Sequence, residues 1–317
     1  MTRTRIPDDV LSAAHARSRA RADRDWTEAD RLRAEIEAAG WKVVDRGTDF
    51  ALSPLTPPDI AFGDRIRYGA SENVPTRAAE PPVGIATVVL VATDHPDDLR
   101  RCLAGMQASA PDGTSIVIVA DDPSDAQAAA LDAIDDAAIE MMWTSDRLGP
   151  VAATNIGIRR AMGPIVIVVD PRTDPSGDVV TPLVRALDDP TVGVAGGWGM
   201  VASDLRSFVD ASPGDVDAVS GDALAFRRSD HASRGPLDER FRVGRSLAAW
   251  WSLVLRDEGE GILPRRAIAV DAFPATRPSP QAADQREDPE AARHAKRDFY
   301  RIHDRFGARR DLLGGPR

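Results

Sequence analysis

The chain has 317 residues, which suits two domains and is too short for a large multidomain assembly. Hydrophobic residues make up 43% of it, so wholesale disorder is excluded. Its 40 basic and 50 acidic side chains give a net charge of −10, which argues against a generally basic coat for nucleic acid but leaves a local patch open. The single cysteine, Cys102, excludes an internal disulfide framework and a zinc site built from several cysteines.

The sequence contains neither a membrane span nor a secretory signal that we can recognise. No stretch approaches the roughly 18 apolar residues that cross a bilayer. Residues 1–10 carry charges without an apolar core. We therefore expect a soluble, cytoplasmic protein with no membrane span and with a reduced thiol.

The first fifty or so residues predict a compact unit of two helices and two strands. The predicted helices cover 8–21 and 27–39, and the predicted strands cover 41–45 and 50–52. Thr27 has the chemistry of an N-cap for the second helix, and Gly40 suits the position after its end. We expect Trp26 and Trp41 in the core of this unit, which we place at residues 1–53.

Residues 54–84 are rich in proline and lack periodicity, which predicts a linker or a strap lying over one domain. After residue 84, β-branched runs alternate with helical patterns, which predicts an α/β domain with a mostly parallel sheet flanked by helices. We place this domain at residues 85–275 and a charged tail with a helix at residues 276–317. The predicted strands cover 86–91, 115–120, 139–143, 165–169 and 192–195, and the helices cover 97–107, 126–138, 151–161, 181–187 and 289–306.

Carboxylates follow three of the predicted strands. Thr93 and Asp94 come after the first strand, Asp121 after the second and Asp170 after the fourth. Ligands of open α/β sheets bind beyond the carboxyl ends of the strands. The sequence therefore predicts a ligand site at this edge of the sheet.

One segment of the first unit has a distinctive pattern of charged residues around a tryptophan. Residues 20–33, together with 39–41 and 44–45, resemble the C-terminal appendage of bacterial cysteinyl-tRNA synthetases. In that family the unit helps to contact the anticodon region, so the resemblance implies tRNA as a partner. The motifs that activate cysteine are absent, so the protein is not a synthetase. Residues 1–53 hold ten basic and ten acidic side chains, so RNA binding would need a local arginine cluster.

A second resemblance rests on motifs in a fixed order. They are the strand and helix at 88–103, the strand end at 117–124, the N-x-G and A-x-G motifs at 155–157 and 161–163, the strand end at 168–170, and the segments 192–197, 221–228 and 236–241. With this spacing, residues 86–273 resemble a family 2 glycosyltransferase of the GT-A fold. The resemblance implies transfer of a sugar from a nucleoside-diphosphate donor to an unknown acceptor. It also implies that the nucleotide sugar is bound by Thr93, Asp94, Asp121, Asn155, Asp170 and Arg172.

The family ends its fourth strand with Asp-x-Asp, which holds Mg²⁺ or Mn²⁺ against the diphosphate. This chain has Asp170-Pro171-Arg172 there, so a cation replaces the second carboxylate. Three interpretations are open. Asp174 completes the metal site from a bulged loop, or Arg172 itself faces the diphosphate without a metal, or catalysis has been lost.

The family's general base is an aspartate that follows the Asp-Glu-x-Phe landmark by about ten residues. No carboxylate lies between Glu239 and Asp257 in this chain. Asp238 and Glu239 are therefore the nearest catalytic candidates, although each also suits a simpler role in closing a turn. Two functions stay open: a glycosyltransferase, or a catalytically inactive protein of the same fold that binds a nucleotide or a partner.

Overall fold

The computed structural model describes residues 6–46, 49–63, 65–278 and 289–313. The chain divides into two compact units, Met1–Pro57 and Pro58–Arg317. No helix within the described residues is long and apolar enough to cross a membrane.

The first unit contains the predicted pair of helices and pair of strands. Its elements are α1 (Asp8–Ala22), α2 (Trp26–Ala38), β1 (Trp41–Arg46) and β2 (Asp49–Pro54). The two strands pair antiparallel, and the two helices pack together beside them. Val10, Ile36 and Trp41 belong to the buried core of this unit.

Two local predictions in the first unit are wrong. Asp25, and not Thr27, caps α2, because its side chain accepts the backbone N–H of Glu28 at 3.1 Å. The helix therefore begins at Trp26, whose side chain is 57% exposed rather than part of the core. The Arg21 guanidinium lies over the Trp26 ring at 5.7 Å.

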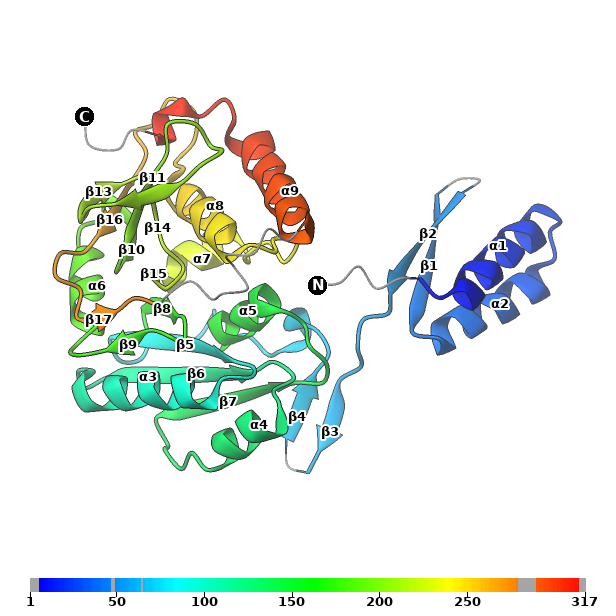
Figure 1. Ribbon diagram of the computed structural model, residues 1–317, viewed down its shortest axis with the longest axis horizontal. Coiled ribbons are helices and arrows are strands. Elements are labelled where there is room, and N and C mark those ends of the chain that lie inside the picture. Colours follow the sequence, from blue (N-terminus) through cyan, green and yellow to red (C-terminus); the bar gives the residue numbers. More distant parts are fainter. Residues whose placement is uncertain (1–5, 47–48, 64, 279–288, 314–317) are drawn as a thin grey trace. The chain divides into compact units, whose positions relative to one another are not determined.

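A ten-stranded sheet forms the centre of the second unit, in the described residues (Figure 1). Its strands are β3 (Ile60–Phe62), β4 (Arg65–Tyr68), β5 (Ala86–Ala92), β6 (Thr114–Ala120), β7 (Ile139–Thr144), β8 (Ile165–Val169), β10 (Val192–Gly196), β13 (Gly214–Val216), β15 (Ala223–Arg227) and β16 (Arg266–Ala269). Their order is β13-β16-β10-β15-β8-β5-β6-β7-β4-β3. The strands β7, β6, β5 and β8 are parallel neighbours, whereas β15 runs antiparallel between β8 and β10. This is the mostly parallel sheet that the sequence predicts.

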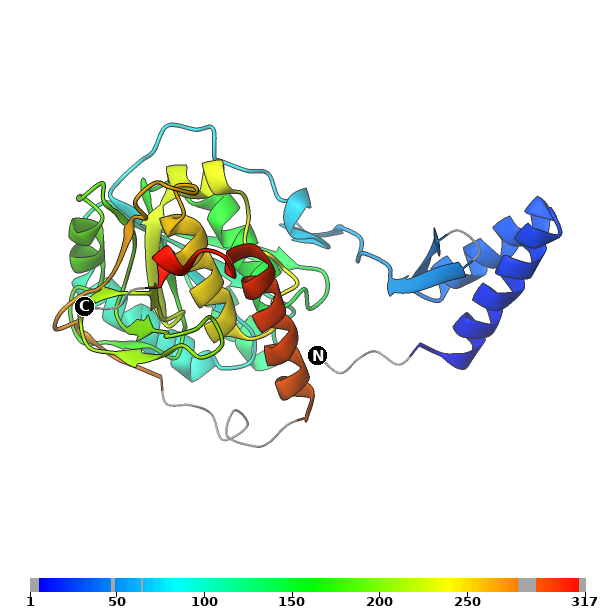
Figure 2. The ribbon, with the colours of Figure 1, turned by 90° about the horizontal axis from the view of Figure 1, so that it is seen from above.

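Helices cover both faces of the sheet. They are α3 (Pro96–Ser109), α4 (Asp125–Asp132), α5 (Pro150–Arg160), α6 (Val180–Ala186), α7 (Arg228–Arg234), α8 (Gly244–Arg256) and α9 (Pro289–Phe306). Alternate residues of β5 point to opposite faces: Val88 and Leu90 lie in the core with α3 and α6, and Val89 lies in the core with α5 and α8. Figures 1 and 2 both show α9 alongside α8.

Short elements complete the second unit. They are β9 (Asp174–Pro175) paired with β17 (Ala275–Thr276), β11 (Gly199–Val201) between β12 (Val209–Ala211) and β14 (Ala218–Val219), and the 3₁₀ helices η1 (Ser71–Asn73) and η2 (Arg310–Leu312). The pairing of β9 with β17 matters most, because it returns the chain near residue 276 to the loop that follows β8.

The segment predicted as a linker holds two strands. Within it, β3 pairs with β4, and β4 adds to the sheet parallel to β7. Ile60 and Phe62 are 43% and 57% exposed. Because no residue of these two short strands is buried, the sequence shows no extended alternation of apolar and polar residues that would predict them. The stretch 69–84, which we call the strap, then follows α5: the N–H groups of Arg77 and Val83 donate to the carbonyls of Arg159 and Met162 at 2.8 and 2.9 Å.

Candidate functional site

The loops after β5, β6 and β7 meet at the carboxyl edge of the sheet. Arg147, after β7, pairs with Asp94, after β5, at 3.0 Å and donates to the carbonyl of Asp122, after β6, at 2.8 Å. The backbone N–H of Ser124 donates to both the Asp94 carboxylate and the Thr93 carbonyl. The structure therefore brings Thr93 and Asp94 together with the loop after β6, as the parallel order requires.

Asp121 also lies at this edge, but its carboxylate is turned into the protein and is 1% exposed. One oxygen accepts the Leu148 N–H at 2.8 Å, and the other accepts the Gly149 N–H at 3.0 Å. Burial raises the pKa of the Asp121 carboxyl, while the two N–H groups act to lower it. Asp121 thus holds the start of α5. Its contact with a nucleotide base stays a prediction that would require the loop before α5 to move.

Asp170 directly follows β8 and is bound on both oxygens by Arg172. The backbone N–H and Nε of Arg172 donate to Oδ1 of Asp170 at 2.9 and 3.0 Å, and an Nη donates to Oδ2 at 2.7 Å. Both side chains are partly accessible, with exposed fractions of 23% for Asp170 and 29% for Arg172. These two predicted site residues therefore form one unit at the strand end.

The residues around Asp170 do not fit a magnesium or manganese site. The carboxylate of Asp174 lies 3.7 Å from Nε of Arg101 and is 47% exposed, and both oxygens of Asp170 are bonded by Arg172. The described parts of the chain contain no group of three or more His, Cys, Asp or Glu side chains that could hold a metal. Hard divalent cations such as Mg²⁺ and Mn²⁺ need several oxygen ligands. The structure therefore gives no support to the predicted pair of metal ligands, Asp170 and Asp174.

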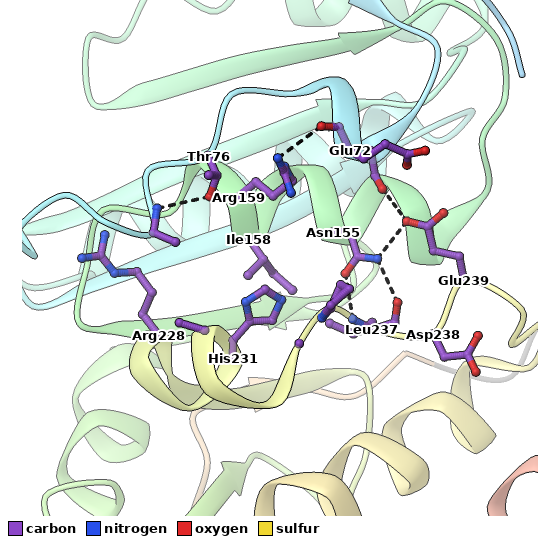
Figure 3. A pocket seen from close by; sticks show the side chains of 15 residues that line it. Glu72, Thr76, Asn155, Ile158, Arg159, Arg228, His231, Leu237, Asp238 and Glu239 are labelled. Atoms are coloured by element: carbon purple, nitrogen blue, oxygen red, sulfur yellow. Dashed lines mark hydrogen bonds between the residues drawn. The ribbon is translucent and has the colours of Figure 1, made fainter.

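Asn155 and Glu239 meet at a cavity of about 540 Å³ between α5, α7 and the strap (Figure 3). The side-chain amide of Asn155 donates to the carbonyl of Leu237 and to Oε1 of Glu239, both at 2.9 Å, and its oxygen accepts the Leu237 N–H at 3.0 Å. The hydroxyl of Ser71, in the strap, donates to the same Glu239 oxygen at 2.5 Å. Asn155 and Glu239 thus join α5, the strap and the loop after α7.

Asp238 lines the same cavity but is held by its neighbour Arg240. The two side chains pair at 2.6 Å, and the Arg240 backbone N–H donates to the same carboxylate at 3.0 Å. The side-chain hydrogen bond from Arg240 keeps the pKa of Asp238 below its ordinary value, even though burial opposes this. A general base works best with a pKa near the working pH, so these contacts suit a turn better than proton transfer.

The predicted site residues therefore occupy two places. The cavity is lined along α5 from Asn155 to Arg159, and by α7, which begins just after β15 pairs with Ile165 at the amino end of β8. Asp170 follows the opposite, carboxyl end of β8. The strand-end cluster and the cavity are consequently separate candidate sites.

His231 belongs to the cavity and was not among the predicted site residues. Figure 3 shows it projecting from α7 towards Ile158. Its ring packs against Phe226 and Trp251 at 6.2 and 5.8 Å between centroids. Burial lowers the pKa of His231 to about 4, with a smaller contribution from the charge of Arg159. The sequence gives no signal for this environment, because Trp251 lies twenty positions away on another helix.

The second unit is similar to known proteins in sequence and in fold. Residues 87–230 match the model for glycosyl transferase family 2. The structure resembles a mannosyltransferase, PcManGT from Pyrobaculum calidifontis, in complex with GDP-Man and Mn²⁺ (TM-score 0.52, 17% identity, 73% of this chain and 67% of that one). It also resembles GalNAc-T7 with UDP, GalNAc and Mn²⁺ (TM-score 0.57, 14% identity, 70% of this chain and 48% of that one). The second unit therefore has the GT-A fold.

A separate likeness concerns a much shorter stretch. Forty residues of this chain are 45% identical to cysteine–tRNA ligase 1 from Burkholderia lata. The match covers 13% of this chain and 8% of the ligase. It is thus a likeness to one small part of that enzyme.

We predict that Asn155→Ala lowers the free energy of unfolding by about 2 kcal/mol, because it leaves buried hydrogen-bonding partners unsatisfied. The matched control is Asn73→Ala, which removes one exposed hydrogen bond to Asp59 and should change stability by a few tenths of a kcal/mol. Chemical denaturation of both variants measures the difference. Equal stabilities for the two variants would contradict the bracing role of Asn155.

We also predict that His231 makes the protein less stable as the pH falls from about 6.5 to about 4. In that window the unfolded chain binds a proton at this position and the folded chain does not, so the unfolded state is favoured by up to about 1.4 kcal/mol per pH unit. Stability should therefore fall less steeply with decreasing pH in His231→Phe, which keeps the packing on Trp251. The control is Ile158→Val, which changes the packing beside His231 without removing a titratable group, and its slope should match the wild type.

Proposed function

We propose that the second unit binds a nucleoside-diphosphate sugar at the carboxyl edge of the sheet and transfers the sugar to an acceptor. One observation carries this proposal: Asp94, Asp121 and Asp170 follow three adjacent parallel strands, β5, β6 and β8, where GT-A proteins bind their donor. The match of residues 87–230 to glycosyl transferase family 2 supports it. The donors named in the two neighbouring structures, GDP-Man and UDP with GalNAc, define the classes to test first.

In the proposed complex, Thr93 and Asp94 contribute to the nucleotide side of the site, and Asp170 with Arg172 faces the diphosphate. Asp121 would support the nucleotide side indirectly, through the loop before α5 that it holds. Catalysis of transfer requires groups that stabilise the charge developing on the leaving diphosphate, and a cation at Arg172 has the right sign.

The two carboxylates predicted as the general base, Asp238 and Glu239, are both bound to protein donors at the cavity. The second function left open by the sequence, a catalytically inactive protein of the same fold that binds a nucleotide or a partner, therefore stays beside the first, and we take its nucleotide-binding form for the test. The two differ in turnover and not in donor binding.

The test is a panel of UDP-, GDP- and dTDP-sugars, each with Mn²⁺ or with EDTA, scored by thermal shift and by release of the nucleoside diphosphate. We expect at least one sugar nucleotide to raise the melting temperature, and Arg172→Gln, which removes the cation proposed to face the diphosphate, to remove the shift. The control is Asp112→Ala, an exposed residue just before β6, at the opposite edge of the sheet. Release of nucleotide indicates a transferase, and a shift without release indicates the binding protein. No shift with any donor would contradict both.

A specific likeness favours a second binding function for the first unit. We propose that it contacts tRNA, as its resemblance to part of a cysteine–tRNA ligase suggests. The arginines of this unit differ in how free their guanidinium groups are to bind phosphate. Arg31 and Arg33 pair with glutamates of α2, whereas Arg19 and Arg24 are exposed and form no ion pair within the described residues.

We expect the full chain to bind tRNA with an affinity that falls as salt rises, because phosphate contacts release counterions. The double variant Arg19→Gln/Arg24→Gln should weaken binding more than Arg31→Gln/Arg33→Gln, because the guanidinium groups of Arg31 and Arg33 already donate to glutamates of α2. Fluorescence anisotropy with labelled tRNA measures both. Equal losses in the two double variants, or no binding by the wild type at low salt, would count against RNA contact.

A further inference from the structure

A second aspartate lies beside Asp170, although the sequence separates the two by 52 positions. Strand β15 pairs antiparallel with β8, so that Ala223 is opposite Val169. The Asp170 N–H donates to the carbonyl of Asp222 at 3.0 Å, and the hydroxyl of Thr173 donates to the same carbonyl at 3.1 Å. The loop that follows β8 and the residue that precedes β15 are therefore hydrogen-bonded to each other.

Each of these aspartates is bound by its own arginine. Arg172 occupies both oxygens of Asp170, as described above. Arg277 donates from Nε to Oδ2 of Asp222 at 2.7 Å, and the Ser220 hydroxyl donates to that same oxygen at 2.5 Å. Two guanidinium groups thus lie at the strand ends where the family motif predicts carboxylates around a metal ion.

The fold places Arg277 there by two independent contacts. The pairing of β9 with β17 sets Thr276 opposite Asp174, two residues after Arg172. The Arg277 guanidinium also lies 5.7 Å from the ring centre of Trp198, whose other neighbour is Phe273 in an edge-to-face contact at 5.3 Å. These contacts fix the plane of the guanidinium before any ligand arrives.

Arg277 can exchange one of its present partners for an anion. It pairs with Asp210 at 2.7 Å, and Asp210 is 57% exposed, so this contact resembles a surface ion pair of small net value. Arg245, in the first turn of α8, also pairs with Asp210 at 2.7 Å and would keep that carboxylate neutralised. Within the described residues, Arg277 makes three hydrogen bonds, and a guanidinium has five N–H donors.

We propose that Arg277, together with Arg172, binds the diphosphate of the donor in place of a divalent cation. This inference rests on the proposed function, which supplies the nucleotide of the donor. The part argued from the structure is a binding site for the diphosphate anion. The planar fork of arginine matches phosphate oxygens and needs no metal. A metal at this place would first have to break a bidentate ion pair, because both oxygens of Asp170 accept hydrogen bonds from Arg172.

The test measures binding of inorganic pyrophosphate, UDP and GDP to the full chain by calorimetry, in EDTA and in Mn²⁺. We expect at least one of these probes to bind in EDTA. Arg277→Gln should weaken that binding about tenfold or more, the usual scale for hydrogen bonds to a charged group. The control is Arg266→Gln, which also removes an arginine that pairs with two aspartates, but at exposed Asp189 and Asp215. It should leave the affinity unchanged.

A second variant changes the binding affinity in opposite directions for an arginine site and for a metal site. Asp222→Asn removes the carboxylate that neutralises Arg277, so binding in EDTA should be retained or become tighter. If Asp222 were a metal ligand, the same variant would weaken binding in Mn²⁺. Binding that needs Mn²⁺, or an Arg277→Gln protein as tight as the wild type, would overturn the inference while leaving the proposed function intact. Tight pyrophosphate binding with no response to any sugar nucleotide would support the anion site and contradict the proposed function.

Discussion

The antiparallel placement of β15 between β8 and β10 is the constraint on which the rest of the second unit depends. It joins the parallel group β7-β6-β5-β8 to the pair β10 and β16 within one sheet. The same placement sets Asp222 beside Asp170 at one end of β8 and starts α7 at the other end. One strand pairing thus positions both Asp222 at the carboxyl edge and the helix that lines the cavity.

The sequence predicts those features of the fold that depend on local pattern. Buried runs such as β5, β6 and β8 are apolar on both sides, and carboxylates at their ends are visible as Asp94, Asp121 and Asp170. The exposed strands β3 and β4 carry no such pattern and could not be found. The partners of the predicted residues were also out of reach. Asp222 and Arg277 come to Asp170 only through strand pairing, and the carboxylate of Asp121 is turned inward by the loop before α5.

The scarcity of lysine takes on a physical meaning in the structure. The sequence has only Lys42 and Lys296 among its 40 cationic side chains. Arg228 is 7% exposed and donates to the carbonyls of Arg77, Ala161 and Glu80. Such a contact needs several donors on separate nitrogens, which lysine lacks.

Arg256 follows the same rule at the far end of α8, where it is 8% exposed and reaches three carbonyls from Nε and one Nη. Arginines therefore connect the strap and the tail to the rest of the second unit. The proposed diphosphate site would use the same property, several N–H donors on one planar group.

The start of α8 shows why donor binding and transfer should be judged separately. The resemblance to glycosyltransferases predicts a general base near this helix, but its first turn contains no acid. A carboxylate does reach this point in space, because Asp298 of α9 accepts the backbone N–H groups of Arg242 and Val243 at 3.1 and 2.9 Å. Asp298 is completely buried and also paired with Arg301, so it holds the chain that leads into α8 and is closed to an acceptor. The proposed binding of a diphosphate by arginines at the strand end depends on none of these contacts. Donor binding and sugar transfer are therefore separate questions for this chain, and each needs its own measurement.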